Sequence, residues 1–338
     1  MRYIFSLLLF LSAHSYAQTY YLSQKVQDIN SNFRGLSIVS DSVAWVSGSN
    51  GTIGKTTNGG TTWQWIKPKG FEKLDFRDIE AFDDKRAIVI NAGAPAYVLL
   101  TIDGGQSWKT SYNNTDSAIF LDGMDFWDDK QGMIFGDPIK NKMQLLKTTD
   151  GGQSWSDLSP ALKVDLADGE AGFAASGSSI KTLGDGKVWI ATGGKVSNVY
   201  ASDNYGGDWK VNRCPIWQGE NSTGAFSIDF INEKIGMVTG GNYLKDKDNH
   251  NNVLLTKDGG KTWTKPLKPV AGYRSGVLIL NDRVSFATGT SGTDVSNDSG
   301  ANWYNISEMS FNTIKKSKNG TLILLVGNKG NIYTLRLE

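Results

Sequence analysis

The sequence contains very little cysteine and histidine, and each shortage excludes a class of site. Cys214 is the single cysteine, so no disulfide can form within the chain. His14 and His250 are the only histidines, which excludes a conventional zinc or haem site built from His and Cys ligands. The formal net charge is +1, so no overall field recruits nucleic acid or an anionic membrane. We therefore expect no metal, no cofactor and no nucleic-acid partner.

Long apolar runs are absent after the first residues of the chain. Arg2 precedes an apolar run over residues 4–11, which is too short to span a bilayer. Ser15 and Ala17 then supply the small residues of a cleavage site, so we predict a signal peptide over residues 1–17. The residue directly after the predicted cut is Gln18 and not a cysteine, which argues against a lipid anchor. This interpretation places the protein in the periplasm or among secreted proteins; the alternative is a buried N-terminal strand.

Glycine and tryptophan are abundant, and together they mark a repeat. The pattern Thr/Ser-x-Asp/Asn-x-Gly-x-x-Trp occurs six times, and we call each copy a box. Successive box tryptophans lie 40 to 54 residues apart, which is the length of one four-stranded propeller blade. The acidic or amide positions of the boxes are Asn58, Asp103, Asp150, Asn204, Asp258 and Asp298.

The chemistry of a box is that of a tight turn. Its Asp or Asn side chain accepts hydrogen bonds from backbone N–H groups two residues on, glycine supplies positive φ, and tryptophan fills the wedge between blades. We interpret the boxes as hairpins between the third and fourth strands of each blade. The alternative, a row of catalytic or calcium-binding acids, is weaker because calcium takes six to eight oxygen ligands and each box offers one carboxylate or amide.

A seventh unit follows the last box without a box of its own. It turns at residues 318–320 and ends at residues 332–335, so it lacks an outermost strand. Residues 20–26 precede the first blade, and we predict that they pair with residues 332–335 and close the ring. The fold expected is therefore all-β: a single seven-bladed β-propeller domain over residues 18–338, with N-terminal strand closure, acting as a monomer.

The loops on one face of this disc vary in length, and that face is the functional candidate. The long loops are residues 136–142, 156–177, 211–224 and 243–252. Residues that enter the innermost strands, or lie in the loops feeding them, should ring the channel mouth there. Our ligand-binding candidates are Arg34, Arg77, Asp122, Glu170, Tyr273 and Arg274. Arginines beside carboxylates suit the recognition of a carboxylate, phosphate or sugar. The alternative is an ion network that satisfies itself and plugs the channel.

Two family resemblances rest on these motifs. The boxes resemble the Asp-boxes, or bacterial neuraminidase repeats, of known propellers. The sequence between the boxes resembles that of photosystem II stability/assembly-factor-like proteins over nearly the whole mature chain. The stretches that carry this resemblance are Phe33-Arg34-Gly35, Val43-Ala44-Trp45-Val46-Ser47-Gly48, Gly136-Asp137-Pro138, Gly272-Tyr273-Arg274-Ser275 and Ser291-Gly292-Thr293-Asp294-Val295-Ser296. The resemblance implies a non-catalytic role in assembly, with an arginine-rich patch that binds a protein partner or, in our interpretation, an acidic glycan.

Some relatives are described as oxidoreductases or glycosyl hydrolases, and each of these functions can be judged against the residues of this sequence. A dinucleotide oxidoreductase needs a glycine-rich turn from strand to helix, whereas the glycine pairs here lie in predicted hairpins. A Ser-His-Asp triad would have to use His250 in a polar loop. A sialidase-like hydrolase would use three arginines, an acid such as Asp122, and Tyr273 activated by Glu170. The Arg-Ile-Pro signature of sialidases is absent, because Gly35 and Leu36 follow Arg34. We therefore favour a binding module and keep the hydrolase as the alternative.

Overall fold

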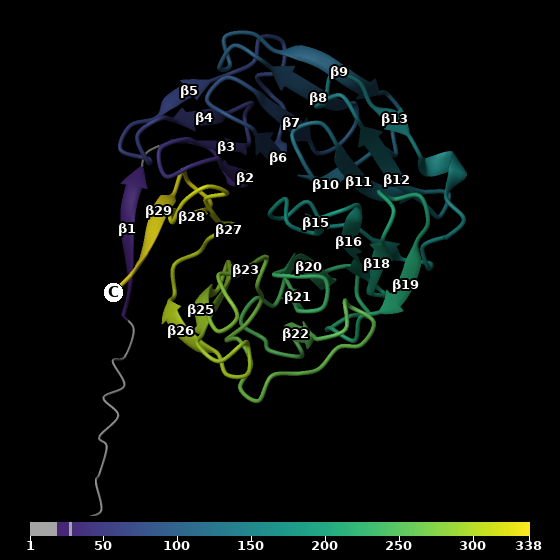
Figure 1. Ribbon diagram of the computed structural model, residues 1–338, viewed down its shortest axis with the longest axis vertical. Helices are drawn as coiled ribbons and strands as arrows, with labels where there is room; N and C mark the ends of the chain where they lie inside the picture. Colours follow the sequence, from purple (N-terminus) through teal and green to yellow (C-terminus); the bar gives the residue numbers. More distant parts are fainter. Residues whose placement is uncertain (1–18, 27–28) are drawn as a thin grey trace, which may run out of the picture.

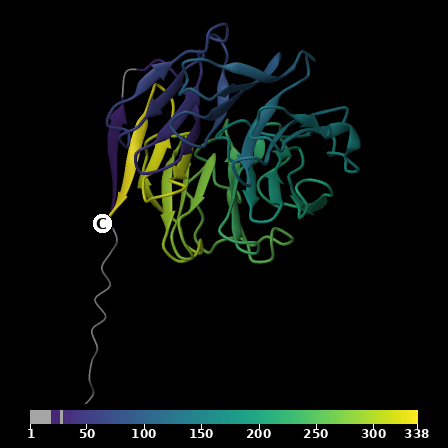
Figure 2. The same cartoon turned by 45° about the horizontal axis from the view of Figure 1, so that its top comes forward.

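The computed structural model describes residues 19–26 and 29–338, and these form a ring of seven β-sheets (Figure 1). The predicted signal peptide lies outside the described residues. The ring has the form of a disc with its ends on one side, where the purple strand β1 (Tyr20–Val26) lies beside the yellow strand β29 (Ile332–Leu337) (Figure 2). The predicted all-β seven-bladed propeller is confirmed.

Blades 1 to 3 are regular four-stranded antiparallel sheets. Within each blade the first strand lies innermost, at the channel, and the fourth lies outermost. Blade 1 contains β2 (Phe33–Ile38), β3 (Ala44–Gly48), β4 (Ile53–Thr56) and β5 (Gln64–Ile66). Blade 2 contains β6 (Phe76–Ala81), β7 (Ala87–Asn91), β8 (Ala96–Thr101) and β9 (Lys109–Asn114). Blade 3 contains β10 (Leu121–Phe126), β11 (Gly132–Ile139), β12 (Lys142–Thr148) and β13 (Ser156–Asp157).

Blades 4 and 5 carry the irregular elements. Blade 4 contains β15 (Ile180–Leu183), β16 (Lys187–Ala191), β18 (Asn198–Ser202) and β19 (Lys210–Arg213). Blade 5 contains β20 (Thr223–Phe230), β21 (Gly236–Asn242) and β22 (Val253–Thr256), and its fourth strand is reduced to a bridge between Leu255 and Thr264. The short strands β14 (Glu170–Ala171) and β17 (Gly193–Gly194) extend the blade 5 sheet through β20. The 3-10 turn η1 (Ser159–Ala161) is the one helical element among the described residues.

Blades 6 and 7 complete the circle. Blade 6 contains β23 (Gly276–Ile279), β24 (Ser285–Gly289), β25 (Gly292–Ser296) and β26 (Tyr304–Ser307). Blade 7 contains β27 (Thr313–Lys316), β28 (Ile323–Val326), β29 and, as its outermost strand, β1. Leu22 pairs with Leu335 in this antiparallel register. The predicted closure by the N-terminal strand is confirmed, and it leaves no long unpaired edge in the last blade.

The hydrophobic core is divided among the interfaces between blades. Each pair of adjacent blades encloses its own cluster of buried side chains. For example, Phe33 and Leu324 lie between blades 1 and 7, Met237 lies between blades 5 and 6, and Phe286 lies between blades 6 and 7. Each blade is therefore packed on both faces, which explains why its inner strands are buried at nearly every position whereas its outermost strand is largely exposed. The blades hold one another in place, and the ring as a whole gives the loops a rigid base.

The boxes form the hairpins between third and fourth strands. In the third box, Asp150 accepts from the N–H of Ser154 at 3.0 Å, four residues on, and Thr148 Oγ1 accepts from the N–H of Gly152 at 2.9 Å. The predicted reach of two residues was wrong: the carboxylate spans the whole turn, whereas the threonine or serine hydroxyl binds the middle of it. The box tryptophans lie at the interfaces between blades, but only Trp303 is fully buried. The other five are half-buried because the hairpins lie on the outer rim.

Candidate functional site

A loop crosses the central channel and divides it into two mouths. We call residues 172–178 the plug loop; it enters from the blade 4 side and contacts blades 1, 2 and 5. Ser178 Oγ lies 2.7 Å from Ser227 Oγ of blade 5, and the carbonyl of Ser178 accepts from the N–H of Ile228 at 2.8 Å. Phe173 stacks on Phe226, with ring centroids 3.8 Å apart. The channel is thus filled by backbone and aromatic rings rather than by an ion network alone.

Two arginines hold the plug loop from the opposite side of the channel. Arg34 donates from Nη1 to the carbonyl of Ala175 at 3.1 Å, and Arg77 donates from Nη1 to the carbonyl of Ala174 at 3.0 Å. Arg77 also donates from Nε to Asp75 at 2.7 Å. Burial and the neighbouring charge of Arg77 lower the pKa of Arg34. Each guanidinium uses one or two of its five N–H groups in these hydrogen bonds, which leaves other N–H groups that can donate to a ligand.

The plug loop and the loops on the face opposite the boxes enclose a cavity of about 470 Å³. Four of the six candidate residues line it: Arg34, Arg77, Asp122 and Tyr273. Aromatic rings form one part of the wall, where Tyr273 meets Phe226 edge to face at 4.9 Å and Tyr243 lies beyond Phe226. The arrangement combines two cations with apolar rings, which suits an extended segment that carries a carboxylate.

Two candidates do not line the cavity. Arg274 is fully buried and its guanidinium pairs with Asp294, at 2.7 Å from Nε and 2.6 Å from Nη2. It lies one position earlier in the repeat than Arg34 and Arg77, because Gly276 pairs with Thr288 as Gly35 pairs with Ser47. A shift of one residue in extended chain reverses the side on which a side chain lies. Tyr273 therefore takes the place in the cavity that we had assigned to Arg274.

Glu170 is likewise committed to the scaffold. Its carboxylate accepts from Asn198 Nδ2 at 3.1 Å, from Tyr200 Oη at 3.1 Å and from the hydroxyl of Thr192. The hydrolase alternative needs this carboxylate to activate Tyr273, and the structure pairs it with Tyr200 instead. Burial raises the pKa of Tyr273, against the lowering effect of Arg34, so the phenol stays protonated rather than becoming a nucleophile.

Asp122 is the most unusual side chain at this mouth. It is fully buried, and neither carboxylate oxygen has a hydrogen-bond partner among the described residues. Burial and the nearby Asp137 raise its pKa well above the ordinary range, whereas Arg77 acts in the opposite direction. Burial also raises the pKa of Asp137, which accepts from the N–H of Gly172 at 2.9 Å. The pair therefore carries less negative charge than its two carboxyls would have in water.

Sequence reasoning missed the plug loop and the residues it brings together. Phe173, Phe226, Tyr243 and Asp137 line the cavity and were not among the candidates. The unusual length of the loop over residues 156–177 was visible in the sequence, but its return into the channel was not. Asp137 lies within the Gly136-Asp137-Pro138 stretch, so that motif was the available signal. In the described part of the chain no cluster of three or more metal-ligating side chains occurs, and no helix is long and apolar enough to span a membrane.

Comparisons with known proteins agree with this fold. No protein-family model matches the chain. It is 26% identical over 298 residues to the photosystem II assembly lipoprotein Ycf48 of Synechococcus sp. (strain CC9902), covering 76% of this chain and 82% of that protein. It is 21% identical over 286 residues to the chloroplastic photosystem II stability/assembly factor HCF136 of Arabidopsis thaliana, covering 80% of this chain and 64% of that one.

A solved structure, that of YCF48 bound to a D1 peptide, superimposes with a TM-score of 0.67 at 15% identity and covers 93% of this chain and 94% of that one. At that identity the superposition speaks for the fold alone. The two curated relatives are described as assembly factors and not as enzymes, in line with the binding module that the residues favoured. In sequence and in fold, this seven-bladed propeller is similar to the photosystem II assembly factors, as the stretches between its boxes indicated.

Proposed function

We propose that this chain is an exported, non-catalytic propeller that binds a segment of a protein partner at the face opposite the boxes, in the manner of an assembly factor. The observation that carries the proposal is the cavity at the Arg34 and Arg77 mouth, where two guanidinium groups with free donors face a wall of aromatic rings. Such a wall takes apolar side chains of a bound segment, and the arginines take a carboxylate.

The comparisons support the kind of partner. Both curated relatives are assembly factors by name, and the solved YCF48 structure of the same fold holds a peptide. We infer that the ligand here is also a peptide, read by its carboxylate and by one or two apolar side chains. An acidic glycan, which would use the same arginines, is the competing ligand.

The test is a titration with two matched peptide sets. Purified chain lacking residues 1–17 is screened against immobilised peptides that end in a free carboxylate and against the same peptides amidated at the C-terminus. We expect saturable binding to a subset of the free acids, weakened about tenfold or more by amidation and by Arg77→Ala. Arg86→Ala is the matched control, because Arg86 lies on the box side, where its guanidinium is 3.8 Å from Asp129 and 4.0 Å from the centre of the Phe82 ring.

Equal binding of acid and amide peptides would contradict the assignment of the arginines, and binding confined to sialylated or sulfated glycans would replace the peptide by a glycan.

Export is tested separately. N-terminal sequencing of the protein recovered from a periplasmic or culture fraction should begin at Gln18. Recovery of the uncut chain from the cytoplasm alone would refute export without touching the ligand assignment.

A further inference from the structure

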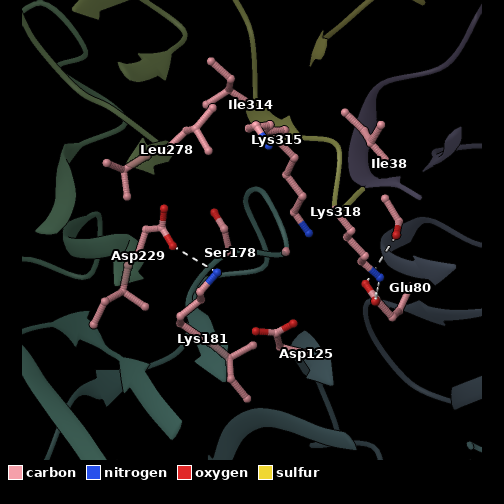
Figure 3. Close-up of a pocket in the computed structure, with 16 residues that line it drawn as sticks. Ile38, Glu80, Asp125, Ser178, Lys181, Asp229, Leu278, Ile314, Lys315 and Lys318 are labelled. Carbon is pink, nitrogen blue, oxygen red and sulfur yellow. Dashed lines mark hydrogen bonds and ion pairs between the residues drawn. The ribbon is translucent and has the colours of Figure 1, made fainter. Parts of the chain in front are cut away.

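The channel has a second mouth on the box side of the plug loop, with a cavity of about 160 Å³. The ends of the innermost strands form its wall: Glu80 from β6, Asp125 from β10, Lys181 from β15, Asp229 from β20 and Lys315 from β27. Figure 3 shows Lys181, Lys315 and Asp125 pointing into the same opening from different blades, with Ser178 of the plug loop at its edge. The opening is separate from the arginine mouth, and nothing in the proposed function uses it.

The carboxylates of this box-side mouth already have partners. Asp229 lies 3.1 Å from the ammonium of Lys181, and Glu80 pairs with Lys318, which also donates to the carbonyl of Ala81 at 3.0 Å. Asp125 accepts from the N–H and the hydroxyl of Thr182, at 2.7 and 3.0 Å. Asp229 and Glu80 are thus compensated by lysines, whereas Asp125 lines the opening and is held by neutral donors, the third being the N–H of Phe126 at 3.0 Å.

Whereas the neighbouring Lys316 donates to the carbonyl of Ser317 at 3.3 Å, Lys315 is the lysine of this mouth whose ammonium has no partner among the described residues. Its side chain is half-buried, and in the described part of the chain its ammonium makes no hydrogen bond and lies within ion-pair distance of no carboxylate. Its charge does act on Asp78, which lies against the plug loop at Gly177, and there it opposes the burial that raises the Asp78 pKa to about 7. A partly desolvated ammonium that points into an enclosed polar space leaves three donors for an anion.

We propose that the box-side mouth binds one phosphate ion, with Lys315 as its main cation, Lys181 as the second, and Asp125 as the acceptor of a phosphate O–H. The size of the space admits a compact ion with part of its water, whereas the arginine mouth is about three times larger. Phosphate near neutral pH carries at least one proton and so donates to Asp125. Sulfate has no proton to donate, and its oxygens would face that carboxylate with like charge.

The experiment is a calorimetric titration of the purified chain lacking residues 1–17 with sodium phosphate, and in parallel with sodium sulfate, at matched ionic strength and neutral pH. We expect saturable binding of phosphate and an affinity for sulfate lower by about tenfold or more. Lys315→Gln should weaken phosphate binding by about tenfold or more, and Lys315→Arg should largely keep it. Lys257→Gln, in an exposed box on the same face, removes the same charge and should change nothing.

Asp125→Asn tests the selectivity directly. It should bring phosphate down toward the affinity for sulfate, because an amide does not require a donor from the ligand. Absence of saturable phosphate binding, or equal affinity for phosphate and sulfate in the unaltered protein, would overturn the proposal even if no variant folded. Phosphate binding unchanged in folded Lys315→Gln would overturn it as well.

Discussion

The guanidinium of Arg77 donates a 3.0 Å hydrogen bond to the carbonyl of Ala174, across the channel and 97 residues along the chain. Arg34 makes the matching bond to Ala175, from 141 residues away. Blades 1 and 2 therefore each contribute an arginine that holds the plug loop, which enters the channel from the blade 4 side. The same guanidinium groups line the cavity proposed for a partner, so the order of the plug loop and the shape of the site depend on the same contacts.

Arg77→Ala should loosen the plug loop before it harms the fold. The change removes the bond to Ala174 and the ion pair with Asp75, and we expect a loss of about 1–2 kcal/mol in unfolding free energy. Hydrogen exchange measured by mass spectrometry should rise in residues 172–178 and stay unchanged in the blade strands. Arg86→Ala should leave exchange in the plug loop as it is. Equal protection of the loop in both variants would mean that the arginine does not hold it.

Asp122→Asn should stabilise the protein at neutral and alkaline pH. The folded-state pKa of Asp122 is raised by burial and by Asp137, so its favourable contribution is full below the ordinary carboxyl pKa and is lost as pH rises through the folded value. The uncharged amide removes this loss. The variant should melt higher than the unaltered chain at about pH 8, by the equivalent of about 1–3 kcal/mol, with a difference that shrinks toward about pH 4. A gap that instead grows toward acid pH would show that the sign is wrong.

The two tryptophans Trp303 and Trp155 should differ in their contribution to stability. Trp303 is 1% exposed, and Trp303→Ala should cost about 3–5 kcal/mol, as for a fully buried aromatic. Trp155 is half-buried at the edge of the blade 2 and 3 interface, where it meets Phe126 edge to face at 6.0 Å. Its replacement should cost less, about 2 kcal/mol. Denaturant unfolding of both variants gives the comparison, and equal losses would contradict the burial argument.

Removal of β1 should make the protein aggregate. Deleting residues 20–26 leaves the ladder side of β29 unpaired, from Ile332 to Leu337. An exposed edge strand of this length is a template for pairing with another chain. We expect a lower melting temperature and high-mass species in size-exclusion chromatography. A shortened chain that stays soluble and melts as before would show that β1 is dispensable for closure.

A panel of aryl sialosides and other aryl glycosides should give no turnover. The carboxylate that would activate Tyr273 is that of Glu170, and it is bound by Thr192, Asn198 and Tyr200. Turnover that disappears in both Tyr273→Phe and Glu170→Gln, with each variant folded, would restore the hydrolase interpretation. The control is protein that has been unfolded by heat, because any turnover that remains comes from contaminating glycosidases of higher stability.

The sequence by itself determined the parts of this protein that depend on short-range contacts. A box is complete within eight residues, because Thr148, Asp150, Gly152 and Ser154 satisfy one another locally. Six such turns at regular intervals, a seventh unit without one, and a spare strand at the other end are enough to predict seven closed blades. The hydrophobic clusters then follow, since each apolar strand has only its two neighbouring blades to pack against.

Only the tertiary structure decided what lies in the channel. The plug loop is held by residues far away in sequence, and no local pattern shows which loop will turn inward. A single position in the strand entering blade 6 places Tyr273 in the cavity and buries Arg274 against Asp294, and repeat alignment does not resolve one residue. Glu170 has the right chemistry for a site and is consumed by neighbours that only the fold brings to it. Local turns are encoded where they form, whereas the contents of a channel depend on which side chains meet across it.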